Sequence, residues 1–115
     1  MRELIRTSSM LGLFVAAALG AAAGAAHAQE TGSVRRGLKL ARQMCSECHL
    51  VVKEAGRSTN PDAPTFATIA ETNGLTGAAL RSMLQTSHRT MPNIIIKGGD
   101  MNDIVAYILS LKDGD

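Results

Sequence analysis

Apolar and polar positions along this chain follow helical spacing. After an uncharged, mostly apolar run over residues 7–26, apolar residues recur three and four positions apart, and no stretch alternates as a β-strand would. The stretches 50–63 and 89–99 have no sustained period and are expected to be long loops, which usually wrap or bind something. The pattern predicts an all-α protein with four helices, which begin near Thr31 or Ser33, and near Pro64, Thr76 and Asp100.

The predicted helices differ in what they carry. The first extends through Cys45 and Cys48 at helical spacing, so it carries both cysteines. The third buries Met83 in an apolar stripe. In the last helix, Asp100 is the expected N-cap and Asp103 complements the positive end of the helix. The buried stripe of that helix is expected to consist of Ile104, Tyr107, Ile108 and Leu111.

The N-terminal segment is typical of an export signal. Arg2 and Arg6 precede the apolar run, and Ala26-His27-Ala28 is a small-x-small cleavage pattern. We expect residues 1–28 to be a secretory signal peptide cleaved after Ala28, which leaves one domain over 29–115. An uncleaved membrane anchor is the alternative, but the second half of the run is mostly Ala and Gly, which partition weakly into lipid.

The composition of the expected mature domain excludes one function class and leaves the core short of large side chains. Two of the 12 basic residues and one of the 10 acidic residues lie in the leader, so residues 29–115 carry a net charge of +1. This balance argues against nucleic-acid binding.

Phe66 and Tyr107 are the only aromatic residues after the leader. Because aromatic rings supply much of the buried area in small domains, another group is expected to fill the core.

The candidate chemistry lies in Cys45-Ser46-Glu47-Cys48-His49, the C-x-x-C-H pattern of covalent c-type haem attachment. Two thiols at this spacing can add to the two vinyl groups of a haem, and the adjacent imidazole then reaches the iron. A thioredoxin-like pair would need a βαβ context, structural zinc a second Cys/His pair, and an iron–sulfur cluster about four thiolates. A disulfide would leave the aromatic-poor core unexplained. The sequence predicts one covalent haem c with His49 on the iron.

A second iron ligand is sought among Met83, His88, Met91 and Met101. Met83 and Met101 fall on helical stripes, where methionine usually fills the core. Pro92 biases Met91 away from helical geometry and places it on a loop, from which its thioether can be aimed at the iron. His88 is the rival and would give bis-histidine ligation. Loop placement favours Met91.

The mature domain resembles the class I, or mitochondrial-type, monohaem cytochromes c of bacterial periplasms. The resemblance rests on the C-S-E-C-H motif, Gly37 eight residues before it, Ala63-Pro64, Met91-Pro92 and the ending 103–111. It implies the small cytochrome c fold, with loops wrapped around the haem and the terminal helices crossing where Gly37 meets Tyr107. It also implies that the Pro64 carbonyl orients the proximal histidine and that Met91 is the distal ligand.

The function implied by the resemblance is electron transfer in the periplasm, not enzymatic catalysis. Two axial ligands leave no open position on the iron, so the iron only changes its oxidation state. A monomer is expected to dock transiently at the haem edge with a dehydrogenase, a respiratory complex or a terminal oxidase, steered by Lys53, Arg89 and Lys97. The alternatives are a dedicated subunit of one dehydrogenase, or a haem-based ligand sensor if Met91 does not bind the iron. There is no Trp for the haem propionates, and the remaining candidates are Arg57, Arg81, His88 and Arg89.

Overall fold

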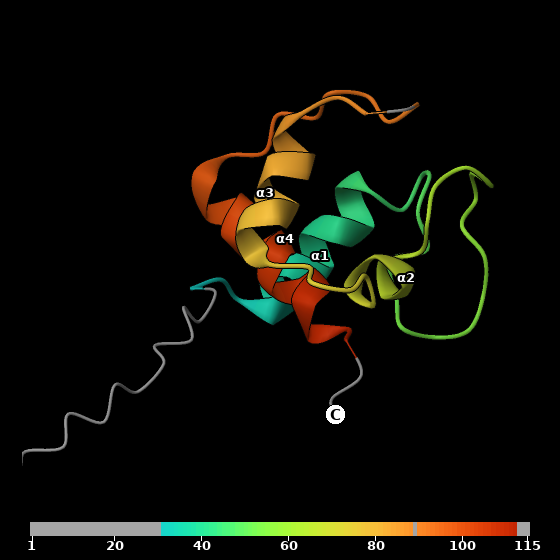
Figure 1. Cartoon of the computed structure of the whole chain (residues 1–115), viewed down its shortest axis with the longest axis horizontal. Coiled ribbons are helices and arrows are strands. Elements are labelled where there is room, and N and C mark those ends of the chain that lie inside the picture. The colour runs from blue at the N-terminus through green and yellow to red at the C-terminus, as the bar shows by residue number, and fades with distance from the viewer. Residues whose placement is uncertain (1–30, 89, 113–115) are drawn as a thin grey trace, which may run out of the picture.

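The computed structural model describes residues 31–88 and 90–112. Within these ranges it has four helices and no β-strand (Figure 1). The prediction of an all-α fold is therefore confirmed. The predicted signal peptide, with its cleavage site, and Arg89 lie outside the described residues. No helix among those described is long and apolar enough to cross a membrane. The helices are α1 (Val34–Met44), α2 (Phe66–Ala70), α3 (Gly77–Gln85) and α4 (Gly98–Ser110).

Helices α1 and α4 cross at the centre of the molecule, and α2 and α3 each contact α4 (Figure 1). The crossing is close because Gly37 has no side chain. A Cβ atom on Gly37 would lie 2.5 Å from Tyr107 Cβ and nearer still to the carbonyl oxygen of Asp103. The pairing of Gly37 with Tyr107 that the resemblance implied is thus present in the structure.

Helix α4 supplies most of the core. Ile104, Val105 and Ile108 are fully buried, and Tyr107 is buried beside them. The Tyr107 hydroxyl donates a hydrogen bond of 2.6 Å to the carbonyl oxygen of Val51, in the loop between α1 and α2. A buried phenol needs such a partner, so the bond fixes this loop against α4.

The starts of three helices follow capping rules. Ser33, Thr65 and Thr76 each accept a hydrogen bond from the backbone N–H three residues later. Ser33 and Thr76 were predicted as caps. Pro64 was expected in the first turn of the second helix, but it precedes the cap Thr65 and stays outside α2. The helix stop was predicted at Asn73-Gly74, but α2 ends earlier, at Ala70 with its C-cap at Glu71. Gly74, with a φ of +72°, lies in the turn between α2 and α3.

Two other helix boundaries differ from the sequence prediction. Helix α1 ends at Met44, so Cys45 is its C-cap and Cys48 lies in the turn that follows. Helix α4 begins at Gly98, after an N-cap at Lys97 that makes no side-chain capping bond. Asp100 therefore lies inside the first turn and is not the cap.

Asp103 has a different role from the predicted one. It is only 2% exposed, and its carboxylate accepts a 2.6 Å hydrogen bond from the backbone N–H of Ser33. It also forms an ion pair with Arg36, with Nε–Oδ2 at 2.9 Å. Because α4 passes the start of α1 at this point, the carboxylate ties the two helices together and does not balance the end of its own helix.

Candidate haem site

A tight turn after α1 brings both cysteines and His49 together. The N–H of Cys45 donates to the Ala41 carbonyl at 2.9 Å and caps the helix. The N–H groups of Cys48 and His49 both donate to the carbonyl oxygen of Cys45, at 3.2 and 2.9 Å. All three C-x-x-C-H side chains line one cavity. The two thiols are not joined as a disulfide.

The Cys45 thiol has the environment of a packed group, not of a redox-active thiolate. Cys45 is buried, and this burial raises the pKa of its thiol to about 11. Reactive cysteines of thioredoxin-like pairs have lowered pKa values and lie in electropositive surroundings. The structure thus disfavours a thiol–disulfide exchange site.

The loop carbonyl of Pro64 orients the His49 ring. His49 Nδ1 lies 2.7 Å from the Pro64 carbonyl oxygen. Because a carbonyl oxygen can only accept a hydrogen bond, the neutral ring carries its proton on Nδ1 and keeps the lone pair on Nε2. The ring also packs against Phe66, with ring centroids 5.5 Å apart. This arrangement is typical of a histidine that binds a metal through Nε2.

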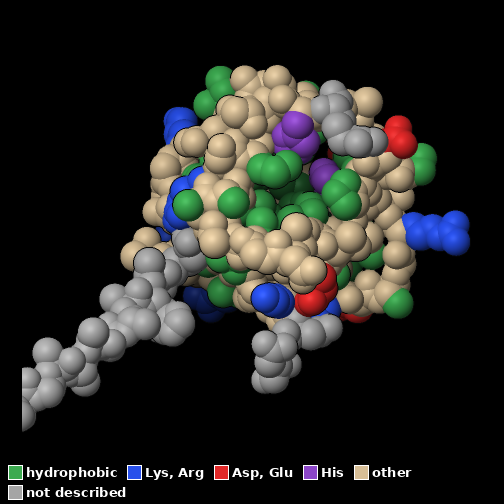
Figure 2. All heavy atoms as spheres, viewed as in Figure 1, with side chains coloured by type: hydrophobic (Ala, Val, Ile, Leu, Met, Phe, Trp, Pro, Cys, Tyr) green, Lys and Arg blue, Asp and Glu red, His purple; other side chains and the backbone are tan. Residues whose placement is uncertain are grey.

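The cavity beside His49 has a volume of about 420 Å³ and is lined mainly by apolar side chains. Figure 2 shows it as a hollow among hydrophobic side chains, with both histidines of the described chain beside it. Its size lies in the range of cofactor pockets. Its apolar walls include Met44, Ile69, Leu75, Leu80, Leu84 and Ile108. Two thiols, an imidazole with a free Nε2 and apolar walls fit a large, flat, iron-bearing group such as haem.

Three of the four candidates for a second iron ligand also line this cavity. Met91, His88 and Met83 line it. Met91 is half-buried on the loop before α4, as its Pro92 neighbour predicted. The prediction that Met83 is buried is wrong, since its side chain is 50% exposed and faces the cavity rim. Met101 is buried and does not line this cavity.

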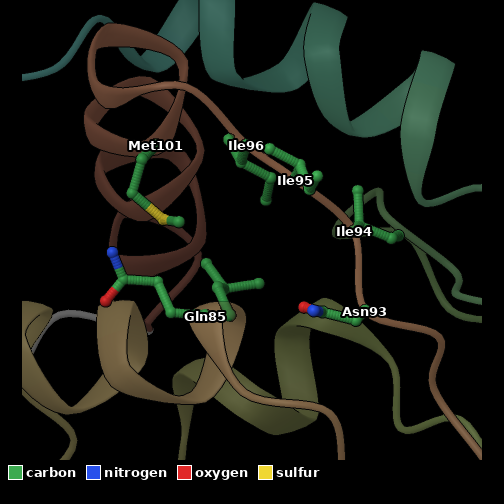
Figure 3. Close-up of a pocket in the computed structure, with 7 residues that line it drawn as sticks. Gln85, Asn93, Ile94, Ile95, Ile96 and Met101 are labelled. Carbon is green, nitrogen blue, oxygen red and sulfur yellow. The ribbon is translucent and has the colours of Figure 1, made fainter.

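Met101 lies instead at a second, smaller hollow of about 260 Å³ (Figure 3). The three consecutive isoleucines 94–96 form part of its wall, together with Gln85 and Asn93. Ile95 is 86% exposed, whereas Ile96 packs against the core. Ile94 lines both hollows. Ile94 is therefore the isoleucine of this run that the two hollows share.

Sequence reasoning missed several polar residues of the cavity wall. Asn60, Thr68, Thr72 and Thr90 all line it. Three of them, Asn60, Thr72 and Thr90, lie on loops, where no periodic signal identifies the face they present. Among the propionate candidates, His88 lines the cavity, while Arg57 does not and Arg81 donates to Asn102 Oδ1 on α4 at 3.1 Å.

Comparison with known proteins shows the family of this chain. No family model matches the chain, and no solved structure matches it. The chain is 30% identical to cytochrome c-552 of Bradyrhizobium diazoefficiens over 101 residues, which cover 88% of this chain and 93% of the relative. An apolar cavity edged by the C-x-x-C-H residues fits a covalently attached haem. This chain belongs to the c-type cytochromes, the family of proteins that carry covalently bound haem.

Proposed function

We propose that this protein is a periplasmic electron carrier that transfers one electron at a time through a single haem c. The observation that carries the proposal is the His49 ring, which is fixed through Nδ1 to the Pro64 carbonyl beside both thiols of the apolar cavity. Kinship with a cytochrome c over most of both chains supports the same conclusion.

Each site residue has one role in this proposal. Cys45 and Cys48 hold the haem through thioether bonds, and His49 binds the iron through Nε2. Met91 supplies the second axial ligand through its thioether sulfur. The haem supplies an iron that changes oxidation state by one electron, at a potential that an axial methionine raises. With His49 and Met91 both bound to it, the iron would have no position left for substrate or oxygen.

In this proposal, electrons pass to and from partner proteins at the rim of the same cavity. Met83 and Pro92 belong to this rim. A small apolar rim of this kind suits weak, short-lived docking. The proposed partners are a dehydrogenase or respiratory complex as donor and an oxidase or reductase as acceptor.

An absorption spectrum of protein expressed in the periplasm tests the proposal. The expected result is the sharp bands of a low-spin c-type haem after dithionite reduction, and the weak far-red band of methionine bound to ferric iron before reduction. Absence of covalent haem would refute the proposal at its centre. Carbon monoxide binding to the reduced protein at neutral pH would favour a ligand sensor over a carrier.

A variant set tests the residue roles. His49→Ala is expected to yield no normal redox-active holo-protein, because the proximal ligand is lost. Cys45→Ala and Cys48→Ala are expected to reduce the yield of covalently attached haem. A His49→Ala protein with the wild-type spectrum and redox response would contradict the axial assignment.

A further inference from the structure

His88 and Met91 face one another across a short backbone pair. They form an isolated antiparallel bridge, in which the Met91 N–H donates to the His88 carbonyl oxygen at 3.0 Å. Residues directly opposite one another in an antiparallel pair direct their side chains to the same face. Both side chains line the large cavity. Two groups that can bind haem iron, an imidazole and a thioether, therefore share one face of one turn.

The His88 ring is held in the same way as the His49 ring. Its Nδ1 lies 3.0 Å from the carbonyl oxygen of Thr86. Since that oxygen can only accept, the neutral ring carries its proton on Nδ1, and Nε2 keeps the lone pair. A hydrogen bond at the other ring nitrogen is what fixes the tautomer of a metal-binding histidine. In the neutral His88 ring, Nε2 is thus the nitrogen that can bind iron.

We propose that the sixth position of the iron has two resident ligands in this chain, and that His88 takes it whenever the Met91 thioether does not. The inference rests on the proposed haem site with His49 as proximal ligand. In the exchange, the iron would lose its bond to Met91 Sδ and gain a bond to Nε2 of the neutral His88 ring, with no electron transferred. The iron site then stays closed to external ligands, and its potential falls because the thioether is replaced by imidazole.

One other residue competes for the same role. Met83 lines the cavity from α3 and carries the same thioether group as Met91. It is not paired with Met91 through the backbone. A decisive experiment must therefore remove the imidazole of His88 and the thioether of Met83 in separate variants.

The experiment compares three haem-bearing variants: Met91→Ala, Met91→Ala/His88→Asn and Met91→Ala/Met83→Leu. Asparagine retains a side-chain N–H that can donate to the Thr86 carbonyl but has no imidazole nitrogen for the iron. The measurements are the ferric spin state by electron paramagnetic resonance, the affinity for added imidazole and the reduction potential. Far-UV circular dichroism checks that each variant keeps its helices.

We expect Met91→Ala to remain low spin, to lose the far-red methionine band and to have a lower reduction potential than the wild type. The variant with His88→Asn should become high spin and bind imidazole at least about tenfold more tightly, because His88 no longer occupies the position. The variant with Met83→Leu should remain low spin.

Two results would overturn the inference. One is a high-spin Met91→Ala protein that binds imidazole as tightly as the His88→Asn double variant. The other is a double variant that stays low spin, which assigns the position to a different residue. If the double variant does not fold, the resonance spectrum of Met91→Ala decides, since two imidazoles give a spectrum unlike that of one imidazole with water or a thioether. The wild-type far-red band tests Met91 ligation separately.

Discussion

Gly37→Ala tests the helix crossing on which the core is built. The added Cβ would lie 2.5 Å from Tyr107 Cβ, whereas carbon atoms pack at about 3.5–4.0 Å, so the overlap is about 1 Å. The carbonyl oxygen of Asp103 lies nearer still, and a backbone atom within a helix cannot rotate away. Overpacking costs about 1–3 kcal/mol, and the better helix propensity of alanine offsets about 1 kcal/mol. Because a backbone atom is involved, the upper cost applies, and the net loss is about 2 kcal/mol.

The assay is guanidinium unfolding of the haem-bearing protein, followed by far-UV circular dichroism. Gly99→Ala is the matched control, because Gly99 also lies in a helix but a Cβ there meets nothing within 4 Å. It should leave the free energy of unfolding unchanged or raise it by up to about 1 kcal/mol. In a thermal scan, Gly37→Ala should lower Tm by about 8 °C or more. If the two alanine variants proved equally stable, the close approach of α1 and α4 would be wrong.

Three further predictions concern the core. Tyr107→Phe leaves the Val51 carbonyl without its donor and should cost about 1–3 kcal/mol at neutral pH. Burial raises the pKa of Tyr107 in the folded protein. The stability that its neutral phenol contributes is therefore complete below the unfolded pKa of about 10 and is lost as the pH rises through the higher folded pKa. A difference in stability between wild type and variant that does not shrink at high pH would contradict this. Asp103→Asn should cost about 1–3 kcal/mol in urea unfolding, because the buried carboxylate accepts two hydrogen bonds that cross from α1; no loss would mean that this link contributes nothing. Ile104→Ala should cost about 2–5 kcal/mol, whereas Ile95→Ala, at a residue that is 86% exposed, should change stability by no more than about 0.5 kcal/mol; equal effects would contradict the burial of Ile104.

The fold class and the helix order could be predicted from the sequence because their signals are local. Ser33 and Thr76 cap the helices they were expected to cap. Each of these signals depends on residues within one turn of the helix end. The contact between Gly37 and Tyr107 came from the family resemblance, since nothing local to either residue indicates the other.

The structure differs from the sequence prediction where one sequence pattern can have two physical causes. An apolar stripe on a helix indicates a face that avoids water, but it does not show whether that face meets another helix or a cofactor cavity. Met83 follows the stripe of α3, yet it lies at the cavity rim. Asp103 has an ion-pair partner 67 residues away, which no local rule could supply. The start of α4 was predicted too late in the chain, because Gly98 and Gly99 give no capping signal and Asp100 gives a misleading one.

The position of His49 depends on Tyr107, although the two residues are far apart in the chain. Val51, two residues after His49, accepts a hydrogen bond from the Tyr107 hydroxyl. Phe66, two residues after Pro64, packs its ring against both His49 and Tyr107, with centroids 5.5 and 6.4 Å apart. His49 and Pro64, the partners of the hydrogen bond that orients the imidazole, are therefore each followed within two residues by a residue that contacts Tyr107. Helix α4 thus helps to position His49, the proposed ligand for the iron, even though the C-x-x-C-H motif follows α1.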